Sequence, residues 1–211
     1  MSEVIIKPVS DNMDKMLTYR NMMVKHRIAM NQKFYFEAIM IEYAMLEDRL
    51  ASFLYHVGVL TPKNGKLKFS SNDTKLFVQN ILENYVLKKP PERIDLKNIS
   101  TKINIVRGLI FFASDSLVEK EHNKYYSTLA AVFKERLDLQ ALQETLNKIT
   151  EWCRCRNEMV HSMLNKSFTD LIDYASPKAK DGIVYARYID KCVDAVKGRN
   201  KIRRSANLVI L

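Results

Sequence analysis

The sequence predicts an all-α protein, and three observations support that fold class. Hydrophobic residues make up 47% of the 211 residues, which is enough to bury a core. The chain has only 5 glycines and 5 prolines, so few positions would interrupt a helix. Apolar residues recur at steps of three and four over much of the chain, a spacing that places them on one helix face. We therefore expect a single domain of long amphipathic helices over residues 1–211.

The N-terminal part contains the most regular of these patterns. Residues 1–9 form a short apolar segment, and we expect it to be an N-terminal arm. A methionine-rich helix follows, with Ser10 or Asp11 as its N-cap. The best amphipathic helix is predicted over residues 31–57. Its apolar positions are Phe34, Ala38, Ile41, Met45, Leu46, Leu50, Phe53, Leu54 and Val57.

The segment 61–73 is the clearest interruption of the helical pattern. It is rich in turn-forming residues and carries Lys63, Lys66 and Lys68, with Phe69 close behind. A solvated loop or a small hairpin is the simpler interpretation. Contact with RNA is the alternative, because lysines attract phosphates and an aromatic ring can stack on a base.

The rest of the chain carries the same helical spacing. We expect Asp73 to cap the first helix of this part, and Ser114 or Asp115 to cap the third. A short buried strand is the alternative near the end of the second, because β-branched residues are dense there. Pro177 is expected to follow a short helix that has already ended. The predicted helices cover residues 73–87 and 96–113, then a stretch after Ser114 or Asp115 that runs through Tyr125 to Phe133, and then residues 139–165, 168–173 and 183–196.

Composition also limits the function and the compartment. The net charge of +10 and the pI of about 9.4 favour a polyanionic partner, most simply nucleic acid, with an anionic membrane as the alternative. No stretch reaches the length of a transmembrane helix, and no signal-peptide pattern opens the chain. Three cysteines and four scattered histidines lack the spacing of a metal site. We therefore expect a cytoplasmic protein with free thiols, no cofactor and no membrane partner.

Three residues near the end of the helix predicted over 139–165 can carry chemistry: Arg156, Asn157 and His161. A guanidinium stays charged and fits a phosphate, while an imidazole exchanges protons near neutral pH. On an ideal helix Arg156 and His161 project about 140° apart and lie about 7.5 Å apart along the axis. One chain then holds a splayed half-site, which two copies related by a two-fold axis would complete. The simpler interpretation is a surface arginine and a partly buried histidine.

The run Arg-Asn-Glu-Met-Val-His at residues 156–161 resembles the signature of the HEPN superfamily, the higher eukaryotes and prokaryotes nucleotide-binding domains. The resemblance implies an all-α antiparallel helical bundle, here with additional helices, that forms a homodimer around the motif. It also implies metal-independent endoribonuclease activity, commonly in toxins with a cognate antitoxin protein or in antiviral defence against phage. An acidic residue on an early helix supports the motif in some members, and Glu42, Glu47 or Asp48 could do so here.

The ribonuclease hypothesis gives each residue a role in cleaving single-stranded RNA. His161 would transfer protons, Arg156 would stabilise the phosphate with help from Arg154, and Asn157 would orient the imidazole or bond to the backbone. The products would carry a 2′,3′-cyclic phosphate and a 5′-hydroxyl. A non-catalytic dimer that binds RNA or a protein partner is the alternative. A basic C-terminal extension, residues 197–211, would guide RNA, bind another polyanion or remain solvated; its cations are Lys197, Arg199, Lys201, Arg203 and Arg204.

Overall fold

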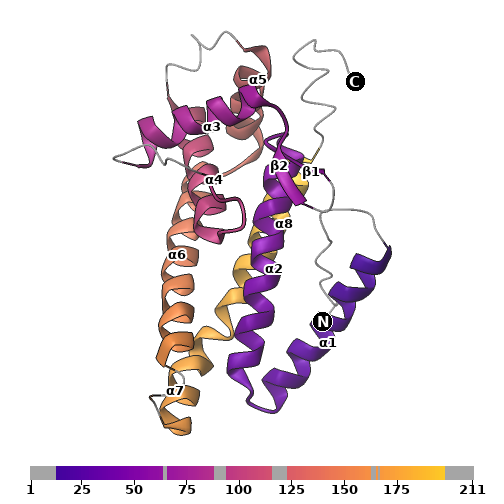
Figure 1. Cartoon of the computed structure of the whole chain (residues 1–211), viewed down its shortest axis with the longest axis vertical. Helices are drawn as coiled ribbons and strands as arrows, with labels where there is room; N and C mark the ends of the chain where they lie inside the picture. Colours follow the sequence, from indigo (N-terminus) through magenta and orange to yellow (C-terminus); the bar gives the residue numbers. More distant parts are fainter. Residues whose placement is uncertain are drawn as a thin grey trace. The chain divides into compact units, whose positions relative to one another are not determined.

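The structure is a computed structural model that describes residues 13–63, 66–87, 94–115, 123–162, 165 and 167–197. The expected N-terminal arm, residues 1–9, lies outside this part of the chain. The basic C-terminal extension also lies outside it, apart from Lys197. The described part is an all-α fold with one small sheet, which confirms the fold class predicted from the sequence (Figure 1).

Helices dominate the described part, and one antiparallel pair of strands interrupts them. The helices are α1 (Met13–Asn31), α2 (Tyr35–His56), α3 (Asn72–Tyr85), α4 (Ile99–Ser114), α5 (Lys124–Arg136), α6 (Leu139–Ser162), α7 (Phe168–Lys178) and α8 (Asp181–Val196). The strands β1 (Leu60–Lys63) and β2 (Lys66–Phe69) form the small hairpin that the sequence allowed in segment 61–73. Within the described residues, no helix combines the length and the apolar character needed to cross a membrane.

The boundary between α1 and α2 differs from the prediction. The chain turns after Asn31, where Lys33 adopts a φ of 61° and the amide of Phe34 donates to the carbonyl of Ala29 at 2.7 Å. These contacts complete the C-terminal turn of α1, so α2 begins at Tyr35 and not at residue 31. Phe34 therefore lies in the turn and is 51% exposed, although the periodicity assigned it to the core.

Four further predictions differ from the structure, and two of them concern helix caps. Ser71, not Asp73, caps α3, because its hydroxyl accepts from the amide of Thr74. Asn123 caps α5 in place of Ser114 or Asp115. Residues 99–114 form a helix, so the strand alternative is wrong. The helix α7 continues through Pro177 to Lys178, although proline has no amide hydrogen to donate to the carbonyl of Asp173.

The chain separates into two compact units. The first contains Met1–Arg49 and Asn147–Lys191, and the second contains Leu50–Leu146 and Cys192–Leu211. The single domain expected over residues 1–211 stays a prediction.

In the first unit, two polar side-chain contacts join α1 to α2, one of them fully buried. The hydroxyl of Tyr19 donates to Asp48 at 2.5 Å, and His26 lies 2.7 Å from Glu42. Tyr19 precedes His26 on α1, whereas the partner of Tyr19 follows the partner of His26 on α2, so the two helices are antiparallel neighbours.

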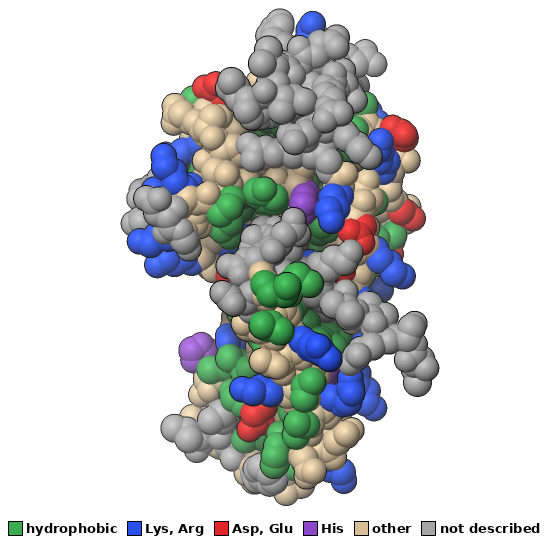
Figure 2. All heavy atoms as spheres, turned by 90° about the vertical axis from the view of Figure 1, so that its right-hand side faces the viewer, with side chains coloured by type: hydrophobic (Ala, Val, Ile, Leu, Met, Phe, Trp, Pro, Cys, Tyr) green, Lys and Arg blue, Asp and Glu red, His purple; other side chains and the backbone are tan. Residues whose placement is uncertain are grey.

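The opposite face of α1 is exposed and apolar. Figure 2 shows hydrophobic side chains among Lys and Arg on the side of the molecule where α1 lies, and the exposed ones of this helix are Met13, Met16, Leu17, Val24 and Ile28.

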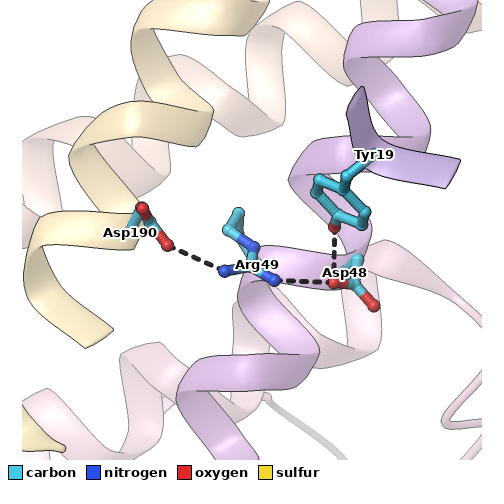
Figure 3. Close-up of polar contacts among 4 residues, drawn as sticks. All are labelled: Tyr19, Asp48, Arg49 and Asp190. Carbon is cyan, nitrogen blue, oxygen red and sulfur yellow. Dashed lines mark hydrogen bonds and ion pairs between the residues drawn. The ribbon is translucent and has the colours of Figure 1, made fainter. Parts of the chain in front are cut away.

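A buried arginine fixes α2 to α8 in the same unit (Figure 3). Arg49 is 1% exposed, and its two terminal nitrogens donate to Asp190 at 2.7 Å and to Asp48 at 2.8 Å. Its Cζ also lies 5.4 Å from the centre of the Tyr19 ring. Burying a guanidinium is costly unless it is paired, and two carboxylates provide that pairing here.

The second unit is built around α4, which packs against both α3 and α5. Phe77 stacks on Tyr126 with ring centres 3.8 Å apart, so α3 and α5 also meet. Gly58 ends α2 with a φ of 76°, and the hydroxyl of Tyr125 donates to the neighbouring carbonyl of Val57. A side chain at position 58 would collide with the Tyr125 ring, so both the backbone angle and the space require glycine.

Candidate functional site

The motif residues lie on the last two turns of α6, in the first unit. The helix is fixed by buried side chains at helical spacing, among them Ile149, Trp152 and Met159. Asn157 and His161 are exposed, whereas Arg156 is half-buried. Two of the three predicted catalytic groups are thus open to solvent, and the third is partly covered by α2.

The guanidinium of Arg156 is held by α2. Its Cζ lies 4.3 Å from the centre of the Tyr43 ring, and one terminal nitrogen lies 3.4 Å from the sulfur of Met40. The other terminal nitrogen donates to Oδ1 of Asn157 at 2.9 Å. The Nε atom is buried and makes no hydrogen bond to the described residues. A cation over a ring face is attracted to it, so the arginine has a defined orientation.

Two acidic groups near Arg156, the Cys153 thiol and the Tyr43 hydroxyl, both have raised pKa values. Burial, with a smaller effect of Glu47, raises the pKa of the Cys153 thiol to about 12. The pKa of Tyr43 is also raised, first by burial and then by Cys153 and Glu47. The charge of Arg156 opposes both shifts. Cys153 is therefore a neutral thiol, which is a poor nucleophile.

The three acids considered on α2 have different surroundings. Glu42 is paired with His26, and Asp48 is paired with Arg49. Glu47 affects the same tyrosine and cysteine as Arg156, so it is the α2 acid in the electrostatic neighbourhood of the motif.

The pair of Glu42 and His26 is a second cluster of titratable groups in this unit. Both side chains are buried. Burial raises the pKa of Glu42 to about 7, although His26 and the backbone amide of Ile183 act in the opposite direction. The start of α8 closes over the carboxyl group: a side chain at Gly182 would meet Glu42 and would lie 2.6 Å from Cζ2 of Trp152. The indole of Trp152 itself donates to the carbonyl of Lys178, which makes this tryptophan a core residue.

The residues predicted to bind RNA are not all described. Arg154 is exposed and forms ion pairs with Glu151 at 2.8 Å and with Glu158 at 3.7 Å. Lys197 is exposed just after the end of α8. The remaining predicted cations lie outside the described residues: Arg199, Lys201, Arg203 and Arg204.

Sequence reasoning missed the residues that hold the motif arginine. Met40 and Tyr43 are three apart on α2, and the first of them is 116 positions from Arg156 in sequence. Their spacing indicates a shared helix face, but nothing in the sequence indicates that this face meets the motif.

Comparisons of the chain with family models, with curated proteins and with solved structures found no match. Among the described residues, no group of three or more His, Cys, Asp or Glu side chains is arranged to hold a metal ion. The three cysteines are free and buried, in agreement with the prediction of free thiols.

Proposed function

We propose that the chain is a metal-independent endoribonuclease that cleaves single-stranded RNA as a homodimer in the cytoplasm. The observation that carries the proposal is the state of the three motif side chains. Arg156 is oriented by Tyr43 and Asn157, while the imidazole of His161 is exposed on the following turns of α6. RNA cleavage requires an oriented cation and an accessible proton-transfer group, and α6 carries one of each.

The chemistry uses the nucleophile that RNA already carries. A neutral His161 takes the proton of the 2′-hydroxyl, and the 2′-oxygen attacks the adjacent phosphorus. The bond from phosphorus to the 5′-oxygen breaks, and the protonated His161 gives its proton to that oxygen. Arg156 stabilises the extra negative charge on the phosphoryl oxygens. The products are a 2′,3′-cyclic phosphate and a 5′-hydroxyl.

A dimer supplies what one chain lacks. Arg156 and His161 project to different sides of the same helix, so a single α6 would not direct both at one phosphate. Two copies related by a two-fold axis place the arginine of one beside the histidine of the other. The resemblance of residues 156–161 to the HEPN signature supports the same arrangement. It also supports a role as a toxin or antiphage effector that an antitoxin protein restrains, which is an argument by analogy.

The direct test is cleavage of single-stranded RNA by the purified protein in the presence of a metal chelator. We expect products with cyclic phosphate ends, and a rate lowered roughly 10²–10⁴-fold by His161→Ala. Arg156→Ala should lower the rate roughly 10²–10³-fold. Lys148→Ala is the matched control, since Lys148 is exposed on α6 outside the motif. Unchanged cleavage in both motif variants, or a requirement for a divalent ion, would refute the proposal.

A non-catalytic RNA- or partner-binding dimer is the second candidate, and one observation favours it. The guanidinium of Arg156 already contacts Met40, Tyr43 and Asn157, and these contacts must loosen before it can clamp a phosphate through both terminal nitrogens. Binding of RNA by the wild type without any cleavage, weakening steeply as salt rises, would select this function.

A further inference from the structure

The β1–β2 hairpin of the second unit has a basic face. In the antiparallel register Lys63 lies opposite Lys66, and Thr61 lies opposite Lys68. Directly opposed residues share a face, and so do residues two apart on one strand. The three lysines are therefore on one face of the hairpin, and all three are exposed. Like charges placed directly opposite each other destabilise a strand pair, so an anion bound along this face would relieve the repulsion.

A hollow of about 320 Å³ lies beside the second strand of this hairpin. It is lined by Leu67, Lys68 and Phe69 of β2, by Lys75 and Gln79 of α3, and by two aliphatic side chains from the segment before α4. Consecutive residues of a strand point to opposite faces of the sheet. Because the hollow is lined by the consecutive residues Leu67, Lys68 and Phe69, it lies along the edge of β2 and not on one face. Its volume falls within the range of small-ligand sites, which is roughly 300–1,000 Å³.

The lining of the hollow selects a ligand that is both anionic and partly apolar. Its charged lining groups are Lys68 and Lys75, and lysine binds phosphate as a point charge. Phe69 and the aliphatic side chains offer a surface for a planar ring. The amide of Gln79 can both donate and accept a hydrogen bond, as the edge of a base requires. A nucleotide combines these properties.

We propose that this hollow and the adjoining lysine face bind single-stranded RNA at a site that shares no residue with the motif on α6. One base lies against Phe69, its phosphates contact Lys68 and Lys75, and the strand continues along the hairpin lysines. The extended row of cations favours a polymer over a single small anion. The choice of RNA among single-stranded nucleic acids rests on the proposed ribonuclease function, whereas the argument for the site does not.

The test measures binding without cleavage, so that it stands apart from the nuclease assay. A fluorescent 2′-O-methyl RNA lacks the attacking hydroxyl and cannot be cleaved by the proposed chemistry. We expect it to bind the full-length wild type. The double variant Lys68→Gln/Lys75→Gln should bind about tenfold more weakly, with a reduced slope of log affinity against log salt. The single variant Phe69→Leu should weaken binding at least about fivefold and leave that slope unchanged.

The control removes the same charge elsewhere in the second unit. The double variant Lys124→Gln/Lys134→Gln changes two exposed lysines of α5, and we expect it to bind nearly as the wild type does. Equal weakening by the two double variants, or absence of binding by the wild type, would overturn the proposal. Tighter binding to phosphatidylserine vesicles or to an acidic peptide than to the oligonucleotide would also overturn it. Binding at the hollow together with an inactive enzyme would refute only the nuclease proposal.

Discussion

The guanidinium of Arg156 lies over the ring of Tyr43, with 4.3 Å between its Cζ and the ring centre. The contact joins the motif on α6 to α2 and determines where the arginine's charge is directed. The ring face is intact in phenylalanine and absent in leucine, so the contribution of this contact can be isolated.

The first prediction concerns that contact. We expect Tyr43→Leu to lower RNA cleavage roughly ten- to a hundredfold, because a displaced guanidinium no longer meets the phosphate in its productive position. Tyr43→Phe retains the ring face and should cleave at nearly the wild-type rate. Cleavage rates of both variants, with thermal unfolding as the check on folding, measure the difference. Equal rates for the two variants would show that the ring does not position Arg156.

The second prediction concerns pH. The pKa of Glu42 rises from 4.5 to about 7 on folding, chiefly through burial. The folded protein therefore binds this proton more tightly than the unfolded chain, and stability falls as pH increases from about 4.5 to about 7. We expect a loss of up to about 3 kcal/mol in the free energy of unfolding across this window, and a smaller loss in Glu42→Gln.

Urea unfolding of both proteins across that pH range checks the prediction. The titratable neighbours of Glu42 are His26 on α1 and Asp181 at the start of α8, and both are retained in the glutamine variant. Parallel pH profiles for the wild type and Glu42→Gln would contradict the assignment of the step to this carboxyl group.

The third prediction compares a buried arginine with an exposed one. Arg49→Met leaves Asp48 and Asp190 without their shared cation, and we expect a loss of about 3–5 kcal/mol in stability. Arg154→Met is the control, because Arg154 is 68% exposed and its pair with Glu151 should contribute at most about 1 kcal/mol. Chemical denaturation measures both. A small effect of the Arg49 substitution would mean that the network in Figure 3 contributes little net stability.

The helices were predictable because each depends on local spacing. The buried positions of α2, among them Met45, Leu50 and Phe53, follow the period expected from the sequence. Phe34 fits the same period, yet it lies in the turn before α2, because the turn is set by backbone contacts to the end of α1. Pro177 was expected to lie beyond its helix because proline lacks an amide hydrogen, yet α7 includes it and ends one residue later, at Lys178.

The candidate site was only partly predictable for a different reason. The motif residues are consecutive or nearly so, and a local pattern is enough to find them. Their surroundings come from distant positions: Tyr43 lies on α2, and Glu42 pairs with His26 from a third helix. Such contacts depend on which helix faces meet, and periodicity identifies a face without identifying its partner.

The most direct test of the proposed function is complementation between two inactive variants. Arg156→Ala and His161→Ala, co-expressed with different affinity tags and isolated as the mixed dimer, leave one intact arginine and one intact histidine on different chains. If each active site combines Arg156 of one chain with His161 of the other, the mixed dimer has one complete site and one that lacks both groups. It should then regain roughly half of the wild-type activity. A mixed dimer as inactive as either parent, beside an active wild type, would contradict a site built from two copies of α6.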